Sequence, residues 1–420
     1  MSNPRDEPGN ADWLDLGPDP DEGRKPPDPR HRYLWYAGAV GLVVVALLLA
    51  QTQHRTDRAA APAGSPSRTA SSSPASSGSF ANPTPSVTAP SDELSTAGLP
   101  AAPRGDPPTV TRLGRPLLDV PADWELFALG PGVVIRIQLA LGRVTSTPVP
   151  TPAIDFPPVF VVGSDRVIVA SPDDTARYVV RDGKPAADLP VALQGATLIL
   201  PGPDQRHLWT NQRAGDLNGL ALVNLDGKPT GVTIDVPPYG SVQGSDGGGY
   251  VLLTSIGGSY DAQPGEVHRI TNGTLLASGP TRWLTVECND SLSCANVVID
   301  HATHARHFLD TPVESADENS GTISPDGKTA ALLLPSDGIS GNGIKLLDLE
   351  SGAGKPVNVT PPATGHSLGP QWAWSPDSRW LFVTDAGGRV IVINRRTARA
   401  TPLGTQLVPV TALAFRHGAG

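Results

Sequence analysis

The sequence lacks a concentrated patch of basic residues. Its 32 Lys and Arg residues are outnumbered by 41 Asp and Glu residues, and the net charge is −9. Residues 1–33 alone carry eight acidic and five basic side chains, so the rest of the chain is only weakly acidic. Binding to a nucleic acid needs clustered positive charge, because the ligand is a chain of phosphates. We therefore expect no nucleic acid among the partners.

The sequence also lacks the common local signatures of catalysis. It contains no Gly-x-Ser-x-Gly elbow, no His-Glu-x-x-His pair, no phosphate-binding loop and no dinucleotide fingerprint. We expect no cofactor. An enzyme that assembles its site from distant loops would leave no such signature, so a lyase or hydrolase stays open as the alternative to a binding protein.

Cysteine is scarce. The two cysteines, Cys288 and Cys294, are six positions apart, and strand-like stretches at 283–287 and 295–299 flank them. The thiols would face each other across the end of a hairpin, and a disulfide there fits an oxidising compartment. The loop-entropy model gives so short a ring roughly 2 kcal/mol of stabilisation. Free thiols, or half of a metal site, are the alternatives.

A transmembrane helix is predicted at residues 33–50. Residues 34–50 contain no charge, and as a helix they would span about 26 Å, the lower limit for crossing the hydrocarbon layer. Four basic residues precede this run closely and two follow it, so we expect a single-pass protein of the cell membrane with a cytoplasmic N-terminus. A cleaved signal peptide is the alternative, although the region before the apolar run is long, acidic and rich in proline.

Two stretches have the composition of disordered segments. Residues 1–32 are dominated by Pro, Asp, Glu and Gly and predict a disordered cytoplasmic tail. Residues 51–110 predict an extracytoplasmic linker, because 42 of the 58 residues in 51–108 are Ala, Pro, Ser, Thr or Gly. Such a tether would reach on the order of 40–60 Å and would hold the domain at 111–416 clear of the membrane.

The C-terminal domain has the texture of an all-β protein, with short β-type runs between Gly, Pro, Asp and Asn residues. A turn that contains an aspartate recurs in it, and an Asp side chain can cap such a turn. The aspartates lie at spacings of 39, 42, 80 and 51 residues, at Asp165, Asp204, Asp246, Asp326 and Asp377.

A second turn recurs about every 43 residues, at Gly142, Gly183, Gly227, Gly273, His304, Gly352 and Ala398. This period is the length of one four-stranded propeller blade. We therefore expect a seven-bladed β-propeller with blades at roughly 116–151, 155–190, 191–237, 239–279, 280–313, 317–362 and 364–404. The run at 410–415 would complete the first blade, which lacks a convincing inner strand, and would close the ring.

Two blades carry a motif that can be compared with a known family. Ser324-Pro325-Asp326-Gly327-Lys328 and Ser375-Pro376-Asp377-Ser378-Arg379-Trp380 each precede a strand-like run. They resemble the repeats of TolB-like β-propellers, and the domain resembles TolB-like or WD-repeat-like propellers as a repeat pattern over about 115–416. The resemblance implies a periplasmic or cell-surface interaction module and names no ligand.

Three histidines, His301, His304 and His307, lie close together and are weak candidates for a metal site. The segment aligns with the solvated turns around Ser351 and Thr397, which favours an ordinary turn. We therefore expect no metal.

The long insertions at 211–219, 255–265 and 335–343 all fall on loops that emerge on one face of the expected propeller. Functional residues concentrate on such loops, so we expect this face to bind an extracytoplasmic protein, glycan or small ligand, or the substrate if the chain is an enzyme. Neutral insertions are the alternative. The candidate binding residues are Arg213, Asp216, Tyr239, Tyr260, Asp261, Asp337, Asn342 and His366.

Overall fold

The computed structural model describes residues 105–150, 159–171, 177–211, 219–237, 240–246, 248–311, 321–334, 343–360 and 372–416. These residues belong to one compact unit, Thr96–Gly420. The predicted tail, the predicted transmembrane segment and most of the predicted linker lie outside the described residues. Within the described part, no helix is both long enough and apolar enough to cross a membrane.

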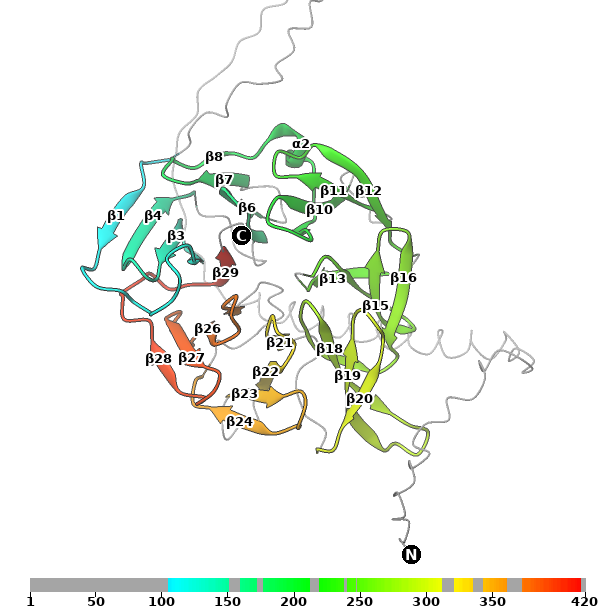
Figure 1. The fold of residues 1–420 in the computed structure, drawn as a ribbon. Helices are drawn as coiled ribbons and strands as arrows, with labels where there is room; N and C mark the ends of the chain where they lie inside the picture. The colour runs from blue at the N-terminus through cyan, green and yellow to red at the C-terminus, as the bar shows by residue number, and fades with distance from the viewer. Residues whose placement is uncertain are drawn as a thin grey trace, which may run out of the picture. The chain divides into compact units, whose positions relative to one another are not determined.

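The described strands form six sheets, which are arranged around a common centre like the blades of a propeller (Figure 1). The first sheet, in spatial order, contains β1 (Thr109–Arg112), β4 (Arg143–Pro148), β3 (Val133–Gln138), β2 (Glu125–Gly130) and β29 (Ala412–Arg416). The second contains β5 (Val159–Val162), β6 (Arg166–Ala170), β7 (Arg177–Arg181) and β8 (Ala187–Asp188). The short helix α2 (Val191–Gln194) follows it in the chain.

The next two sheets have four antiparallel strands each. One contains β9 (Ile199–Pro201), β10 (His207–Asn211), β11 (Gly219–Asn224) and β12 (Pro229–Asp235). The other contains β13 (Ser241–Ser245), β14 (Val251–Ser255), β15 (Gly258–Gln263) and β16 (Glu266–Thr271).

The remaining strands form an eight-stranded sheet and a four-stranded one. The larger sheet contains β17 (Thr274–Ser278), β18 (Arg282–Cys288), β19 (Cys294–Asp300), β20 (Arg306–Leu309), β21 (Gly321–Ile323), β22 (Thr329–Leu334), β23 (Gly343–Asp348) and β24 (Gly354–Val357). The smaller contains β25 (Trp372–Trp374), β26 (Trp380–Thr384), β27 (Val390–Asn394) and β28 (Ala400–Pro402).

The all-β, propeller-like prediction is confirmed, but the expectation of seven separate blades is not met among the described residues. The reason is a short parallel pairing of β17 with β21, in which Ala277 lies beside Gly321 and Ser278 beside Thr322. This contact joins two antiparallel groups, β17–β20 and β21–β24, into one hydrogen-bonded sheet.

The predicted boundary near residue 279 is also wrong. Residues 255–265 are not a long loop, because Ser255 and Gly258 close a tight hairpin between β14 and β15. The next turn is then centred on Gly265, which has a φ of 82°, and not on Gly273. As a result Thr274–Ser278 forms the first strand of the following group, which is complete and not shortened.

The last strand closes the ring as predicted. β29 pairs antiparallel with β2, from Glu125 opposite Arg416 to Leu129 opposite Ala412. The guanidinium of Arg416 lies 3.0 Å from a Glu125 carboxylate oxygen and 2.7 Å from Asp182 of the second sheet. The carbon at the centre of this guanidinium lies 4.4 Å above the centre of the Phe127 ring. The C-terminal strand is thus fixed to two sheets.

The apolar core lies mostly between neighbouring sheets. One cluster joins Leu126, Ile135 and Leu413 of the first sheet to Phe382 and Val390 of the last. This packing follows from the two-residue period of a strand, which presents alternate side chains to the sheets on either side.

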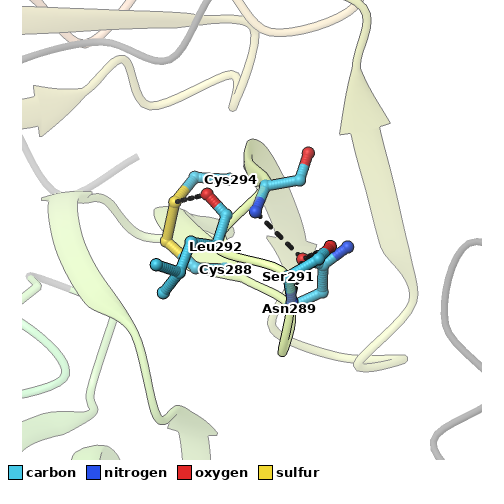
Figure 2. The surroundings of a disulfide bond; sticks show 6 residues. Cys288, Asn289, Ser291, Leu292 and Cys294 are labelled. Atoms are coloured by element: carbon cyan, nitrogen blue, oxygen red, sulfur yellow. Dashed lines mark hydrogen bonds between the residues drawn. A yellow bond between two sulfur atoms is a disulfide. The ribbon is translucent and has the colours of Figure 1, made fainter.

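The predicted disulfide joins Cys288 to Cys294 at the turn between β18 and β19 (Figure 2). Asn289 Oδ1 accepts hydrogen bonds from the backbone N–H of Ser291 (3.1 Å) and of Ser293 (3.0 Å). Leu292 has a φ of 61° at the tip of this turn. The disulfide and the Asn289 side chain together hold the turn.

Candidate functional site

Six of the eight residues predicted to bind a ligand lie outside the described residues: Arg213, Asp216, Tyr239, Asp337, Asn342 and His366. The two that are described, Tyr260 and Asp261, lie in β15 and not in a loop. Tyr260 packs against the apolar cluster that contains Trp209. The Asp261 side chain is 0% exposed, so it does not contribute to an open rim.

The three histidines do not converge. His301 is buried, His304 occupies a turn with a φ of 56°, and His307 is exposed in β20. No group of three or more potential metal ligands occurs in the described ranges. The Asp300 side chain caps the turn, because its Oδ1 accepts hydrogen bonds from the N–H and Oγ1 of Thr303 (3.0 and 2.9 Å).

The same turn is built three times, as the sequence alignment of these segments predicted. Asp348 Oδ1 accepts hydrogen bonds from the N–H and Oγ of Ser351 (both 2.8 Å). Asn394 Oδ1 accepts from the N–H and Oγ1 of Thr397 (3.0 and 3.1 Å). The residue that follows has a positive φ in both cases, 70° at Gly352 and 54° at Ala398. The two turns therefore have the same side-chain cap and the same backbone conformation at the residue that follows it.

These last two turns border a groove of about 700 Å³ between the β21–β24 group and the β25–β28 sheet. The first group contributes Thr329, Leu346, Asp348, Ala353 and Lys355, and the second contributes Ser378, Arg379, Asn394, Arg395, Arg396 and Thr397. Both turns join the third strand of a group to the fourth. The loops predicted to bind a ligand join the second strand to the third, and in an antiparallel sheet these emerge at the opposite end.

The groove is strongly cationic within an acidic chain. Four of its lining residues are basic and one, Asp348, is acidic, whereas the whole chain has a net charge of −9. Arg395 is already paired, since its Nη1 lies 2.5 Å from Asp326 Oδ2 and also donates to the Ser378 carbonyl. Lys355 Nζ donates to the Arg396 carbonyl at 3.0 Å. This bond links the two walls of the groove.

The remaining two arginines are open to solvent. The Arg379 side chain is 69% exposed, and its Nε is 3.8 Å from Asp377 Oδ2. Arg396 is exposed, and no carboxylate of the described residues forms an ion pair with it. The Asp348 carboxylate is already used as a hydrogen-bond acceptor within its own turn. Partial burial would raise its pKa, but hydrogen bonds from Ser351 and Glu350 and the charge of Arg395 outweigh this effect and lower the pKa.

A second polar cluster is buried between β13–β16 and β17–β20. His301 Nδ1 lies 3.4 Å from Asp246 Oδ2, and the two side chains are 3% and 0% exposed. The His301 ring contacts Trp283, with ring centres 3.7 Å apart and ring planes tilted by 32°, and forms a T-shaped contact with Tyr250. Among the described residues, Asp246 Oδ2 and Asp261 Oδ1 have no hydrogen-bond partner.

Burial shifts the titration of this cluster. It raises the pKa of Asp246 to about 7, and the nearby charge of Asp261 adds to this effect. Burial also raises the pKa of Asp261 to about 6, against a hydrogen bond from Gln263. It lowers the pKa of His301 to about 4. Near neutral pH, His301 is therefore uncharged, Asp261 is mostly ionised and Asp246 is partly protonated.

Sequence reasoning missed the cationic groove. Its basic residues come from two groups of strands about 40 residues apart, so no local motif contains them. A signal was present, because Lys355, Arg395 and Arg396 stand at or just after the equivalent turns of consecutive repeats, and lysine occurs only six times in the chain.

Comparison with known proteins gives structural similarities only. No protein-family model and no curated protein matches the chain. It is similar to apo AztD from Citrobacter koseri, with 15% identity over 71% of this chain and 99% of that one and a TM-score of 0.39. TolB from Acinetobacter baumannii has 14% identity over 71% and 68% of the two chains and a TM-score of 0.35. A puromycin-hydrolyzing peptidase from Mycobacterium tuberculosis has 14% identity over 74% and 54% and a TM-score of 0.44. Similarities this low assign neither a family nor a function to the chain.

Proposed function

We propose that this chain is a binding protein whose β-propeller is held outside the cytoplasm by residues 33–50 and takes up a ligand without transforming it. The observation that carries the proposal is the groove lined by Lys355, Arg379, Arg395 and Arg396. An open groove with exposed charges on both walls suits recognition.

Two further features support the location. The disulfide between Cys288 and Cys294 fits an oxidising compartment. The apolar run at 34–50 and the Pro- and Ala-rich linker that follows it have the composition of an anchor and a tether.

We further propose that the ring has seven blades. The eight-stranded sheet consists of two four-stranded antiparallel groups, and only two residue pairs join them. Counting each group as a blade gives every blade four strands, with β1 added at the outer edge of the first.

Catalysis has less support than binding. The strongly perturbed carboxyl groups, those of Asp246 and Asp261, are enclosed between two groups of strands and line no part of the cationic groove. Their burial favours a structural role. The face that carries Arg213, Asp216, Asp337 and the other predicted loop residues stays a predicted second contact surface.

Photo-crosslinking from the groove tests the proposal. A photoreactive amino acid replaces Ala353, an exposed and uncharged residue of the groove, in the full chain expressed in intact cells. A second variant carries it in place of Arg399, the matched control, which is exposed at the equivalent position of the next turn and does not line the groove. We expect an adduct from position 353 and none from position 399. Equal labelling at both positions, or none at either, contradicts a ligand site in the groove.

A further inference from the structure

We infer that the groove takes a phosphate ester, an inference that rests on the proposed function. The groove brings three cationic groups together from two strand groups: Lys355 from one, and Arg379 and Arg396 from the other. Arg395, the fourth, is excluded from this set because Asp326 already neutralises it.

The three groups keep hydrogen-bond donors free for a ligand. The Lys355 ammonium has three N–H donors, and one of them is directed to the Arg396 carbonyl. The guanidinium of Arg379 meets Asp377 only through Nε at 3.8 Å, beyond hydrogen-bond distance. Arg396 has no ion pair among the described residues. An anion that enters the groove can therefore accept hydrogen bonds without displacing an internal partner.

The number of charges favours phosphate over a single carboxylate. A phosphate monoester carries about −1.5 to −2 charges near neutral pH and offers three acceptor oxygens. Arginine matches this geometry with two parallel N–H groups. A single carboxylate would satisfy one of the two open arginines and leave the other unpaired.

The size of the groove favours an ester over the free ion. A volume of about 700 Å³ lies within the range of sites for whole small molecules. Ala353, which is exposed, contributes apolar surface beside the cations. The groove thus has room for an organic group that the phosphate anchors.

Calorimetry on the full chain in neutral detergent tests this inference. The probes are glycerol 3-phosphate, inorganic phosphate and glycerol, with mixed micelles of the detergent and a neutral lipid, containing or lacking phosphatidic acid, as a second source of the same ester chemistry. The variants are the double substitution Lys355→Gln with Arg396→Gln, and Arg399→Gln as the control. We expect glycerol 3-phosphate to bind more tightly than inorganic phosphate, and glycerol not to bind. The double variant should lose affinity by about tenfold or more, because two charge-assisted hydrogen-bond donors are removed.

The calorimetry and the crosslinking together distinguish failure of the phosphate inference from failure of the proposed binding function. Binding of the free ester, or of mixed micelles only when they contain phosphatidic acid, supports phosphate chemistry and identifies its source, provided that the double variant loses it and Arg399→Gln keeps it. Binding that survives in the double variant overturns the inference. If no phosphate probe binds while position 353 still crosslinks to a ligand in cells, the phosphate inference fails and the binding function stands. If position 353 does not crosslink either, both fail.

Discussion

Asp326 and Arg395 form an ion pair across the boundary between two groups of strands, with Arg395 Nη1 2.5 Å from Asp326 Oδ2. Asp326 lies in the first turn of its group, and Arg395 lies in the third turn of the next. Asp246 and His301 hold the same two positions at another boundary. At the boundary between β17–β20 and β21–β24, the first turn of β17–β20 contains no aspartate. The residue in the third turn of β21–β24 is there Leu349, which is fully buried. At these three boundaries, the residue in the third turn of one group corresponds to the presence or absence of an aspartate in the first turn of the group before it.

The Asp326–Arg395 pair should contribute little to stability, and the turn cap should contribute more. Asp326→Asn can keep the hydrogen bond from the Lys328 N–H while it removes the charge, so we expect a loss of about 0.5–1 kcal/mol. Asp326→Ala removes both and should cost about 1–2 kcal/mol. Urea denaturation of the full chain measures both losses. Equal losses for the two substitutions would show that the cap contributes nothing.

Asp246→Asn should stabilise the protein at alkaline pH. The folded pKa of Asp246, about 7, lies above its ordinary value, so wild-type stability falls as the pH rises from about 4 to 7. Asn keeps an acceptor for the Gly248 N–H and avoids the buried charge. The variant should therefore exceed wild type by a few kcal/mol at pH 8, since one pKa unit is about 1.4 kcal/mol. The difference should vanish near pH 4.

Asp300→Asn is the control of opposite sign. The hydrogen bond that Asp300 accepts from the Thr303 side chain is the main reason why the pKa of Asp300 lies below its ordinary value, although burial opposes this effect. Loss of this carboxylate should therefore cost stability at neutral pH, and the cost should shrink as the pH falls through the ordinary range of an aspartate. Urea midpoints at several pH values measure both variants. Two curves with the same slope would contradict the assignment for Asp246.

Arg416→Ala should be the most destabilising of these substitutions. It removes one of the two arginine partners of Glu125 at a position where the Arg416 side chain is only 5% exposed, and the other partner, Arg136, remains. Loss of one member of a buried ion pair costs about 3–5 kcal/mol, because it leaves the other charge enclosed, and we expect the lower end of this range because Arg136 stays paired with Glu125. Arg399→Ala, at an exposed site, should cost less than about 0.5 kcal/mol. Similar free energies of unfolding for the two variants would mean that closure does not depend on Arg416.

Loss of the disulfide should cost about 2 kcal/mol, the loop-entropy value for a ring closed over six positions. The double substitution Cys288→Ser with Cys294→Ser should lower the melting temperature by a few degrees, and a reductant should lower that of the wild type equally. The reductant should have no effect on the double variant. If the double variant melted at the same temperature as the wild type, the hydrogen bonds of Asn289, and not the disulfide, would account for the stability of this turn.

Local chemistry made part of the fold predictable. Ser-Pro-Asp-Gly marks the turn at Asp326 because the turn is formed by its own residues: Asp326 Oδ1 accepts from the Lys328 N–H and the Ser324 hydroxyl. The disulfide was predictable for the same reason, since its two cysteines close one hairpin. The strand at Ala412–Arg416 overlaps the run at 410–415 that was predicted to complete the first blade.

The errors arose where strand pairing or packing between sheets decides the structure, and not the residues of one turn. Ser255-Ile256-Gly257-Gly258 reads as part of a loop, and its hairpin is defined by the pairing of Leu253 with Tyr260. The Asp246–His301 contact joins residues 55 positions apart, and the cationic groove forms where two repeats meet. Neither could be read from a single segment, because packing between sheets brings the residues together.

The pairing of β29 with β2 also sets the order in which this domain can be completed. Glu125 leaves the ribosome 291 residues before its partner Arg416, so during synthesis the first sheet waits with an open inner edge. Unpaired strand edges recruit other chains. A product truncated before residue 412 would lack β29, would keep that edge unpaired and would be prone to pair with other chains.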